Sequence, residues 1–150
     1  MGTRSAIARQ NGNSIEAIYC HWDGYISGVG KVLSSYYDEA EEVQALIALG
    51  DLSSLGGKLS GTKEHSFGKP EDNVCVAYGR DRGESDTGAK SFKTVQDFVS
   101  EMAHSGCEYF YYFDGDNWFV CDGEVDEKGF PVFGFLDVAI AIDEDTKIYG

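Results

Sequence analysis

The sequence predicts an α+β fold, a single domain over residues 1–150 with a mainly antiparallel twisted sheet and about three helices packed on one side of it. Strand-like segments with turn signals lie towards both ends of the chain. Segments with apolar residues at helical spacing lie between them and do not alternate regularly with the strands. At 150 residues, 42% hydrophobic and 13% aromatic, the chain is long and apolar enough for one core.

The first element expected is a hairpin of residues 5–9 and 14–21, joined by the sequence QNGN, because Asn-Gly is a strong turn signal. Both faces of its second strand are partly apolar, which indicates a central or doubly covered strand. Residues 28–50 then predict two short helices, ended by Gly50.

Two long loops are expected near residues 51–73 and 80–90, separated by a strand at 74–79. Residues 94–104 predict the clearest helix, since apolar residues recur at positions i, i+3, i+4 and i+7. The aromatic-rich segment 108–121 predicts a second hairpin.

The C-terminal segment 130–142 predicts one or two more strands.

Charge is distributed unevenly. Residues 1–93 carry ten basic and thirteen acidic side chains, whereas residues 94–150 carry two and thirteen, for a net charge of −14. Such a chain repels nucleic acid and membrane surfaces, so neither is expected as a direct partner. Its start has no apolar signal-peptide core and no apolar run reaches membrane-spanning length, which favours the cytoplasm.

The second hairpin is the first candidate site. On a strand of alternating side chains, one aromatic face enters the core and the other is left as a surface, here with an acidic rim. A calcium loop is excluded because Trp118 and Phe119 stand at ligand positions. The residues predicted to bind a partner are Tyr112, Asp114, Asp116, Trp118, Asp122 and Glu124.

The alternative site is a basic pocket for a small anion or nucleotide beneath the first long loop. The segment CHWDGYISGVGK is not a phosphate-binding P-loop, because its glycine spacing is wrong and Val32 replaces the hydroxyl residue. Its glycines could still free backbone N–H groups at a helix start. Arg80 and Arg82 could fork onto one anion, and the alternative is that they pair with Asp81, Glu84 or the acidic C-terminal half. The residues predicted for this site are His21, Asp23, Lys31, Arg80 and Arg82.

The sequence gives little indication of a metal site or of a catalytic site. The four cysteines form no CxxC pair and the three histidines show no ligand spacing, so neither a metal nor a cofactor is expected and the cysteines are predicted to be reduced and buried. With no recognisable catalytic constellation, no catalytic residue is predicted, and a protein that is not an enzyme is favoured.

The segments MGTRSAIA, IYCHWDGYISGVGK, LIALGDLSSLG and RDRGE resemble a family of small phage-encoded proteins with no assigned activity. The resemblance covers much of residues 1–84 and implies expression in the cytoplasm of an infected bacterium. Together with the acidic hairpin, it favours an accessory protein that binds and inhibits a host factor with a basic surface, a defence protein being one such class. A homodimer through the aromatic hairpin is a further alternative.

Overall fold

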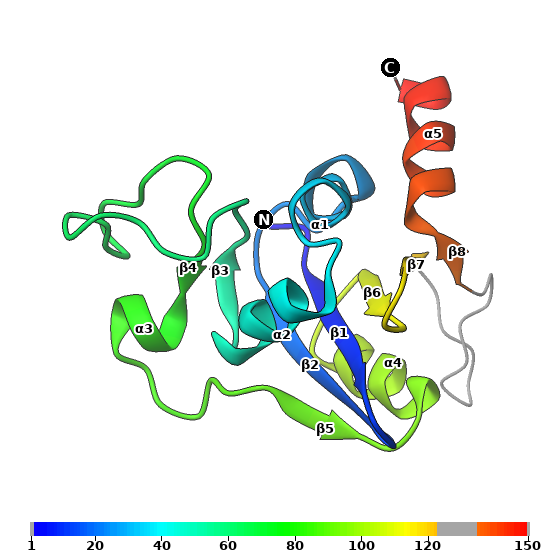
Figure 1. The fold of residues 1–150 in the computed structure, drawn as a ribbon, viewed down its shortest axis with the longest axis horizontal. Coiled ribbons are helices and arrows are strands. Elements are labelled where there is room, and N and C mark those ends of the chain that lie inside the picture. Colours follow the sequence, from blue (N-terminus) through cyan, green and yellow to red (C-terminus); the bar gives the residue numbers. More distant parts are fainter. Residues whose placement is uncertain (1, 123–134, 150) are drawn as a thin grey trace.

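In this computed structural model the described residues, 2–122 and 135–149, contain eight strands in one mixed sheet (Figure 1). The strand order is β4-β3-β2-β1-β6-β7-β8, and β5 pairs with β2 beside this path. Five pairings are antiparallel, whereas β1–β6 and β2–β3 are parallel. The strands are β1 (Ser5–Asn11), β2 (Ser14–Cys20), β3 (Leu52–Ser54), β4 (Val76–Ala77), β5 (Lys90–Phe92), β6 (Tyr109–Phe113), β7 (Trp118–Asp122) and β8 (Leu136–Asp137).

Helices complete the α+β fold that the sequence predicts. Three of them have nine or more residues, and the others are single short turns. The helices are the π-helical turn η1 (Ile26–Gly30), α1 (Lys31–Tyr36), α2 (Ala40–Ala48), α3 (Tyr78–Arg82), α4 (Val95–His104) and α5 (Val138–Tyr149).

The β1–β2 hairpin is buried on both faces, as its sequence indicates. Its register pairs Ala8 with Ala17 and Ile7 with Ile18, so residues of one face meet across the two strands. Ile7 and Ile18 lie in one apolar cluster, and Ala8 and Ala17 lie in another. The hairpin therefore needs a cover on each side.

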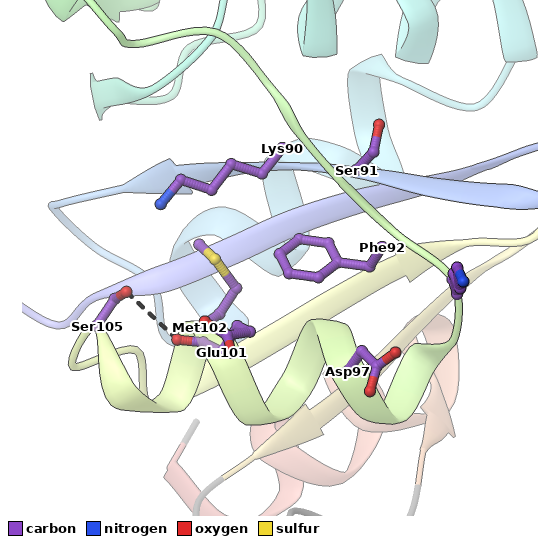
Figure 2. Close-up of a pocket in the computed structure, with 8 residues that line it drawn as sticks. Lys90, Ser91, Phe92, Asp97, Glu101, Met102 and Ser105 are labelled. Carbon is purple, nitrogen blue, oxygen red and sulfur yellow. Dashed lines mark hydrogen bonds between the residues drawn. The ribbon is translucent and has the colours of Figure 1, made fainter.

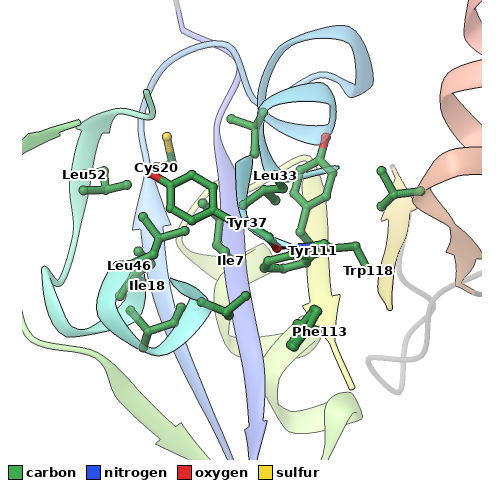
Figure 3. Close-up of a cluster of buried hydrophobic side chains, with 14 of the residues drawn as sticks. Ile7, Ile18, Cys20, Leu33, Tyr37, Leu46, Leu52, Tyr111, Phe113 and Trp118 are labelled. Atoms are coloured by element: carbon green, nitrogen blue, oxygen red, sulfur yellow. Dashed lines mark hydrogen bonds between the residues drawn. The ribbon is translucent and has the colours of Figure 1, made fainter. Parts of the chain in front are cut away.

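The helices supply these two covers, so the expectation that they pack on one side of the sheet is wrong. Leu33 of α1 and Leu46 of α2 pack in the cluster on one face, the α2-side core (Figure 3). Phe98 and Met102 of α4 pack in the cluster on the other face, the α4-side core. The spacing that predicts α4 is confirmed, and Thr94 caps its start by accepting a hydrogen bond from the Asp97 amide.

The β6–β7 hairpin is confirmed, but both of its aromatic faces are inside. Tyr111 and Phe113 join the α2-side core, and Phe110 joins the α4-side core. The Tyr111 hydroxyl donates to the carbonyl of Gly24 at 2.7 Å, in a fully buried bond that ties β6 to the turn after β2.

The strand predicted at 74–79 is shorter in the structure, because the chain turns into α3 at Tyr78. A carboxylate oxygen of Asp81 accepts a hydrogen bond from the Ala77 amide, and Gly83 ends the helix with a positive φ of 75°. The second long loop therefore begins after Arg82, three residues later than expected.

The prediction of one or two strands at 130–142 is largely wrong, because most of its described part is helix α5. Residues 130–134 lie outside the described residues, β8 has two residues, and α5 follows at once. The Asp137 carboxylate accepts a hydrogen bond from the Ala139 amide and so stabilises the helix start. Val138, Ala141 and Ile142 then face the α2-side core at helical spacing.

We predict that Tyr111→Phe lowers the free energy of unfolding by about 1–2 kcal/mol, because it leaves the buried Gly24 carbonyl without its donor. Tyr36→Phe, at a side chain that is 47% exposed, is the matched control and should change stability little. Urea unfolding of both variants measures the difference, and equal stabilities would contradict the role given to this bond.

Candidate functional site

The residues of the predicted anion pocket do not form one site. His21 follows β2, where its Nδ1 shares a hydrogen bond of 2.7 Å with the Tyr19 hydroxyl. Asp23 adopts a positive φ of 58° and accepts a hydrogen bond from Tyr25. Lys31 is exposed at the start of α1, and the two arginines lie on α3, at the far end of the sheet in Figure 1.

The glycine-rich turn is also not an anion cradle. The Gly28 amide donates to the Tyr25 carbonyl, and the Val29 amide donates to the Asp23 carbonyl. A side chain at Gly30 would press on the Tyr111 ring. The amides are thus used within the turn, and Gly30 permits close packing onto β6.

Arg80 is occupied by its own chain. Its guanidinium donates to both carboxylate oxygens of Asp81, at 3.0 Å each, and to the Cys75 carbonyl at 2.7 Å. Its remaining nitrogen donates to the Leu59 carbonyl and the Ser60 hydroxyl. These bonds use all five guanidinium donors, so Arg80 fastens the loop before β4 and has none left for an anion.

A polar network extends this fastening through the loop. The Nδ1 atom of His65 accepts a hydrogen bond from the Glu71 amide, and Nε2 lies 3.1 Å from the Cys75 carbonyl. This pattern assigns the proton to Nε2 in the neutral ring. The Glu71 carboxylate accepts from the Thr62 hydroxyl and amide, and these bonds hold its pKa below the usual range.

Asp81 is the centre of the network. Burial alone would raise the pKa of its carboxyl, but hydrogen bonds from Arg80 and the Ala77 amide outweigh burial and hold the pKa below 3.8. His65 adds a contact of 3.6 Å between Nε2 and Oδ2. Arg82 lies outside, with its guanidinium over the Phe67 ring at 4.9 Å and 3.6 Å from the Glu84 carboxylate.

The predicted acidic hairpin is exposed at its turn but not along its aromatic strands. Asp114 and Asp116 are exposed, and an Asp114 oxygen accepts from the amides of Asp116 and Asn117. Trp118 is only 5% exposed and donates from Nε1 to the Tyr37 carbonyl, so its prediction as a surface contact is wrong.

Of the other three members of the predicted surface, the structure places the side chain of Tyr112 only. Tyr112 is half-buried towards the opposite face, where its hydroxyl donates to Gln10 and its ring packs on Phe135. Asp122 ends β7, and Glu124 lies outside the described residues. Tyr112 is therefore not beside the acidic turn, whereas the largely buried Trp118 lies beneath it and lines the same pocket as Asp116.

Other carboxylates join the turn instead. A small pocket of about 120 Å³ is lined by Asp38 from the turn before α2, Asp116 from the hairpin and Asp137 from β8, and none of its described lining residues is basic. Glu41 and Glu42 are exposed in the first turn of α2, which follows Asp38, and their charges favour the helix dipole. The acidic face is formed by Asp38, Asp114, Asp116 and Asp137.

Two exposed apolar side chains are next in sequence to residues of the pocket. Leu136 precedes Asp137 and is 38% exposed, and Ile140 follows the pocket residue Ala139 and is 51% exposed. Sequence reasoning missed both because it assigned their segment to strands. The Asp137 cap followed by apolar residues at helical spacing is the signal that identifies them.

The cysteines are buried and form no disulfide, as predicted. Burial raises the pKa of Cys20 and of Cys107 to about 12. Within the described parts of the chain, no three His, Cys, Asp or Glu side chains are placed to hold a metal ion. No described helix is long and apolar enough to cross a membrane.

Comparison with known proteins gives no relative: no family model, curated protein or solved structure matches the chain. The site is therefore judged on its geometry.

We predict that Arg80→Lys loosens the loop before β4, because a lysine cannot replace five fixed donors. Tryptic cleavage at the exposed Lys63 should accelerate about tenfold, since bonds to charged groups are among the stronger hydrogen bonds. Arg82→Lys keeps the number of tryptic sites and is the matched control. Equal cleavage of the two variants would refute the fastening role of Arg80.

We also predict a pH signature for Asp81. Because its pKa is lowered in the folded state, its stabilisation is present above pH 3.8 and is lost as the pH falls through the lower folded value. Asp81→Asn should be less stable than the wild type at pH 7 and should lose less stability between about pH 5 and pH 2. Urea unfolding across this range tests it, with the exposed Asp72→Asn as control; parallel curves for wild type and Asp81→Asn would oppose it.

Proposed function

We propose that the protein is a binding protein, without catalytic activity, that uses its acidic face to bind and inhibit a protein with a basic surface. The observation that carries this proposal is the convergence of Asp38, Asp116 and Asp137 on one pocket from three separate elements. Carboxylates brought together in this way raise the local negative potential and attract a basic partner.

The energetics fit a salt-sensitive complex. The carboxylates of the acidic face are at the surface, so each pair with a partner's lysine or arginine contributes little alone, and several together set the association rate and orientation. Leu136 and Ile140, next in sequence to the pocket residues Asp137 and Ala139, supply exposed apolar area that a partner can bury.

The resemblance of residues 1–84 to phage-encoded proteins suggests the partner's source. We place the complex in the cytoplasm of an infected bacterium, and a host protein that handles nucleic acid, such as a defence protein, is the partner class we favour. In such a protein the acidic face would occupy the groove that normally receives phosphates.

We predict that the protein, immobilised and exposed to bacterial host lysate, retains a basic protein that salt releases. The variant Asp38→Asn, Asp114→Asn, Asp116→Asn, Asp137→Asn should bind it about tenfold more weakly, since each exposed pair contributes roughly 0.2–1 kcal/mol. Asparagine keeps the oxygens that accept the backbone hydrogen bonds at positions 114 and 137, so the fold is preserved.

The control variant neutralises four exposed carboxylates elsewhere: Glu64→Gln, Asp72→Asn, Glu84→Gln and Glu108→Gln. It changes the net charge equally, so loss of binding in both variants would indicate a net-charge effect. Unchanged binding by the acidic-face variant, or retention of no basic protein, would refute the proposal.

A further inference from the structure

A groove of about 540 Å³ runs between strand β5 and helix α4 (Figure 2). It shares no lining residue with the pocket of the acidic face. Phe92 and Met102 form its apolar floor and belong to the α4-side core. In Figure 2, Lys90 and Ser105 lie towards one end of the groove, and Asp97 lies towards the other.

One wall of the groove is a sheet edge. Within the described residues β5 pairs with β2 alone, through Ile15–Phe92, Glu16–Ser91 and Ala17–Lys90. The outer edge of such a strand presents backbone N–H and C=O groups to a further strand. Because Ile15 and Ala17 face the α4-side core, their partners Phe92 and Lys90 also point to the α4 side.

The charges on the two walls are opposite and do not pair. Lys90 and Lys93 lie on or next to β5, and Asp97 and Glu101 lie on α4. None of these four side chains forms an ion pair with another residue in the described part of the chain. The groove thus offers positive and negative groups on either side of an apolar floor.

We propose that this groove binds an extended peptide segment of a partner protein, which adds a strand to β5. An acidic side chain would lie at Lys90, an apolar one over Phe92 and Met102, and a basic one at Asp97. Alternate residues of an extended peptide face the same side. The peptide sequence expected along the groove is therefore an acidic residue, any residue, an apolar residue, any residue and a basic residue.

The occupant follows from what the groove presents. A small anion would leave Asp97, Glu101 and the strand edge unused. A second copy joined edge to edge is also disfavoured, because the segment Lys90–Lys93 contains no acidic residue to meet Lys90. A peptide supplies both charges, an apolar side chain and backbone partners for the edge.

The test is an NMR titration of the full-length, ¹⁵N-labelled protein with two capped seven-residue peptides. Both peptides carry glutamate, valine and lysine at alternate positions with threonine at the positions between. The order of the three residues is reversed in the second peptide, so that the pair covers a strand added to β5 in the parallel and in the antiparallel direction. We expect one of them to shift the amides of β5 and α4 and to bind more weakly as salt increases.

Charge exchange makes the test specific. Lys90→Glu should weaken binding of that peptide about tenfold, and a peptide with lysine in place of glutamate should restore it. Lys63→Glu, in the exposed loop before β4, is the matched control and should bind like the wild type. The amide spectrum of each variant reports whether it is folded.

Three results would overturn the proposal. The first is that neither peptide shifts the β5 and α4 amides at millimolar concentration. The second is that the charge exchange fails to restore binding. The third is that the β5 amides shift with protein concentration alone, which would identify a second copy as the occupant. None of these results bears on the acidic face, so the two proposals fail separately.

Discussion

Burial of the β1–β2 hairpin on both faces is the constraint on which the rest of the structure depends. Neighbouring residues such as Ile7 and Ala8 point to opposite sides, and both are fully buried. Exposing either face would leave a continuous apolar strip in water. The helices α2 and α4 must therefore pack on opposite sides, which makes this a three-layer structure around one sheet.

Burial of the hairpin on both faces also determines which side chains are at the surface. The aromatic residues of β6 lie beside β1 in the parallel pairing and are drawn into the same two cores. Charged side chains collect at the strand ends and helix starts, where water remains. The acidic face is thus built from turns such as the one at Asp114–Asn117, with the aromatic residues beneath it.

Short sequence signals correctly predict the turns and helix caps that depend on neighbouring residues alone. Gly12 in the Asn-Gly turn has a φ of 60°, and Thr94 caps α4, both within a few residues of the elements they define. Arg80 could not be predicted in the same way, because its acceptor on Leu59 lies 21 residues away in the chain. Trp118 likewise depends on Tyr37, 81 residues distant.

The same limit explains why the acidic site contains residues that the sequence does not indicate, and why the residues of the predicted anion pocket do not form one site. The carboxylates at 114 and 116 could be identified because a hairpin turn is exposed wherever it lies, but their partners Asp38 and Asp137 come from distant segments. For Arg80 and Arg82 the sequence leaves both an anion and the nearby carboxylates open as partners, because it gives a side chain's charge and not its acceptors. In the structure Arg80 donates to the Asp81 carboxylate and to the carbonyls of Leu59 and Cys75, and the carbonyls are the acceptors that the sequence does not indicate.

The three-layer arrangement also separates the two proposed surfaces. The pocket of the acidic face includes Phe113, Trp118 and Val138 of the α2-side core, whereas the groove rests on Phe92 and Met102 of the α4-side core. The sheet lies between them, so a partner on one side need not displace a partner on the other. A small protein with this arrangement can hold two segments of one target, or two targets, at once, and linking two modest contacts raises the overall affinity above that of either one.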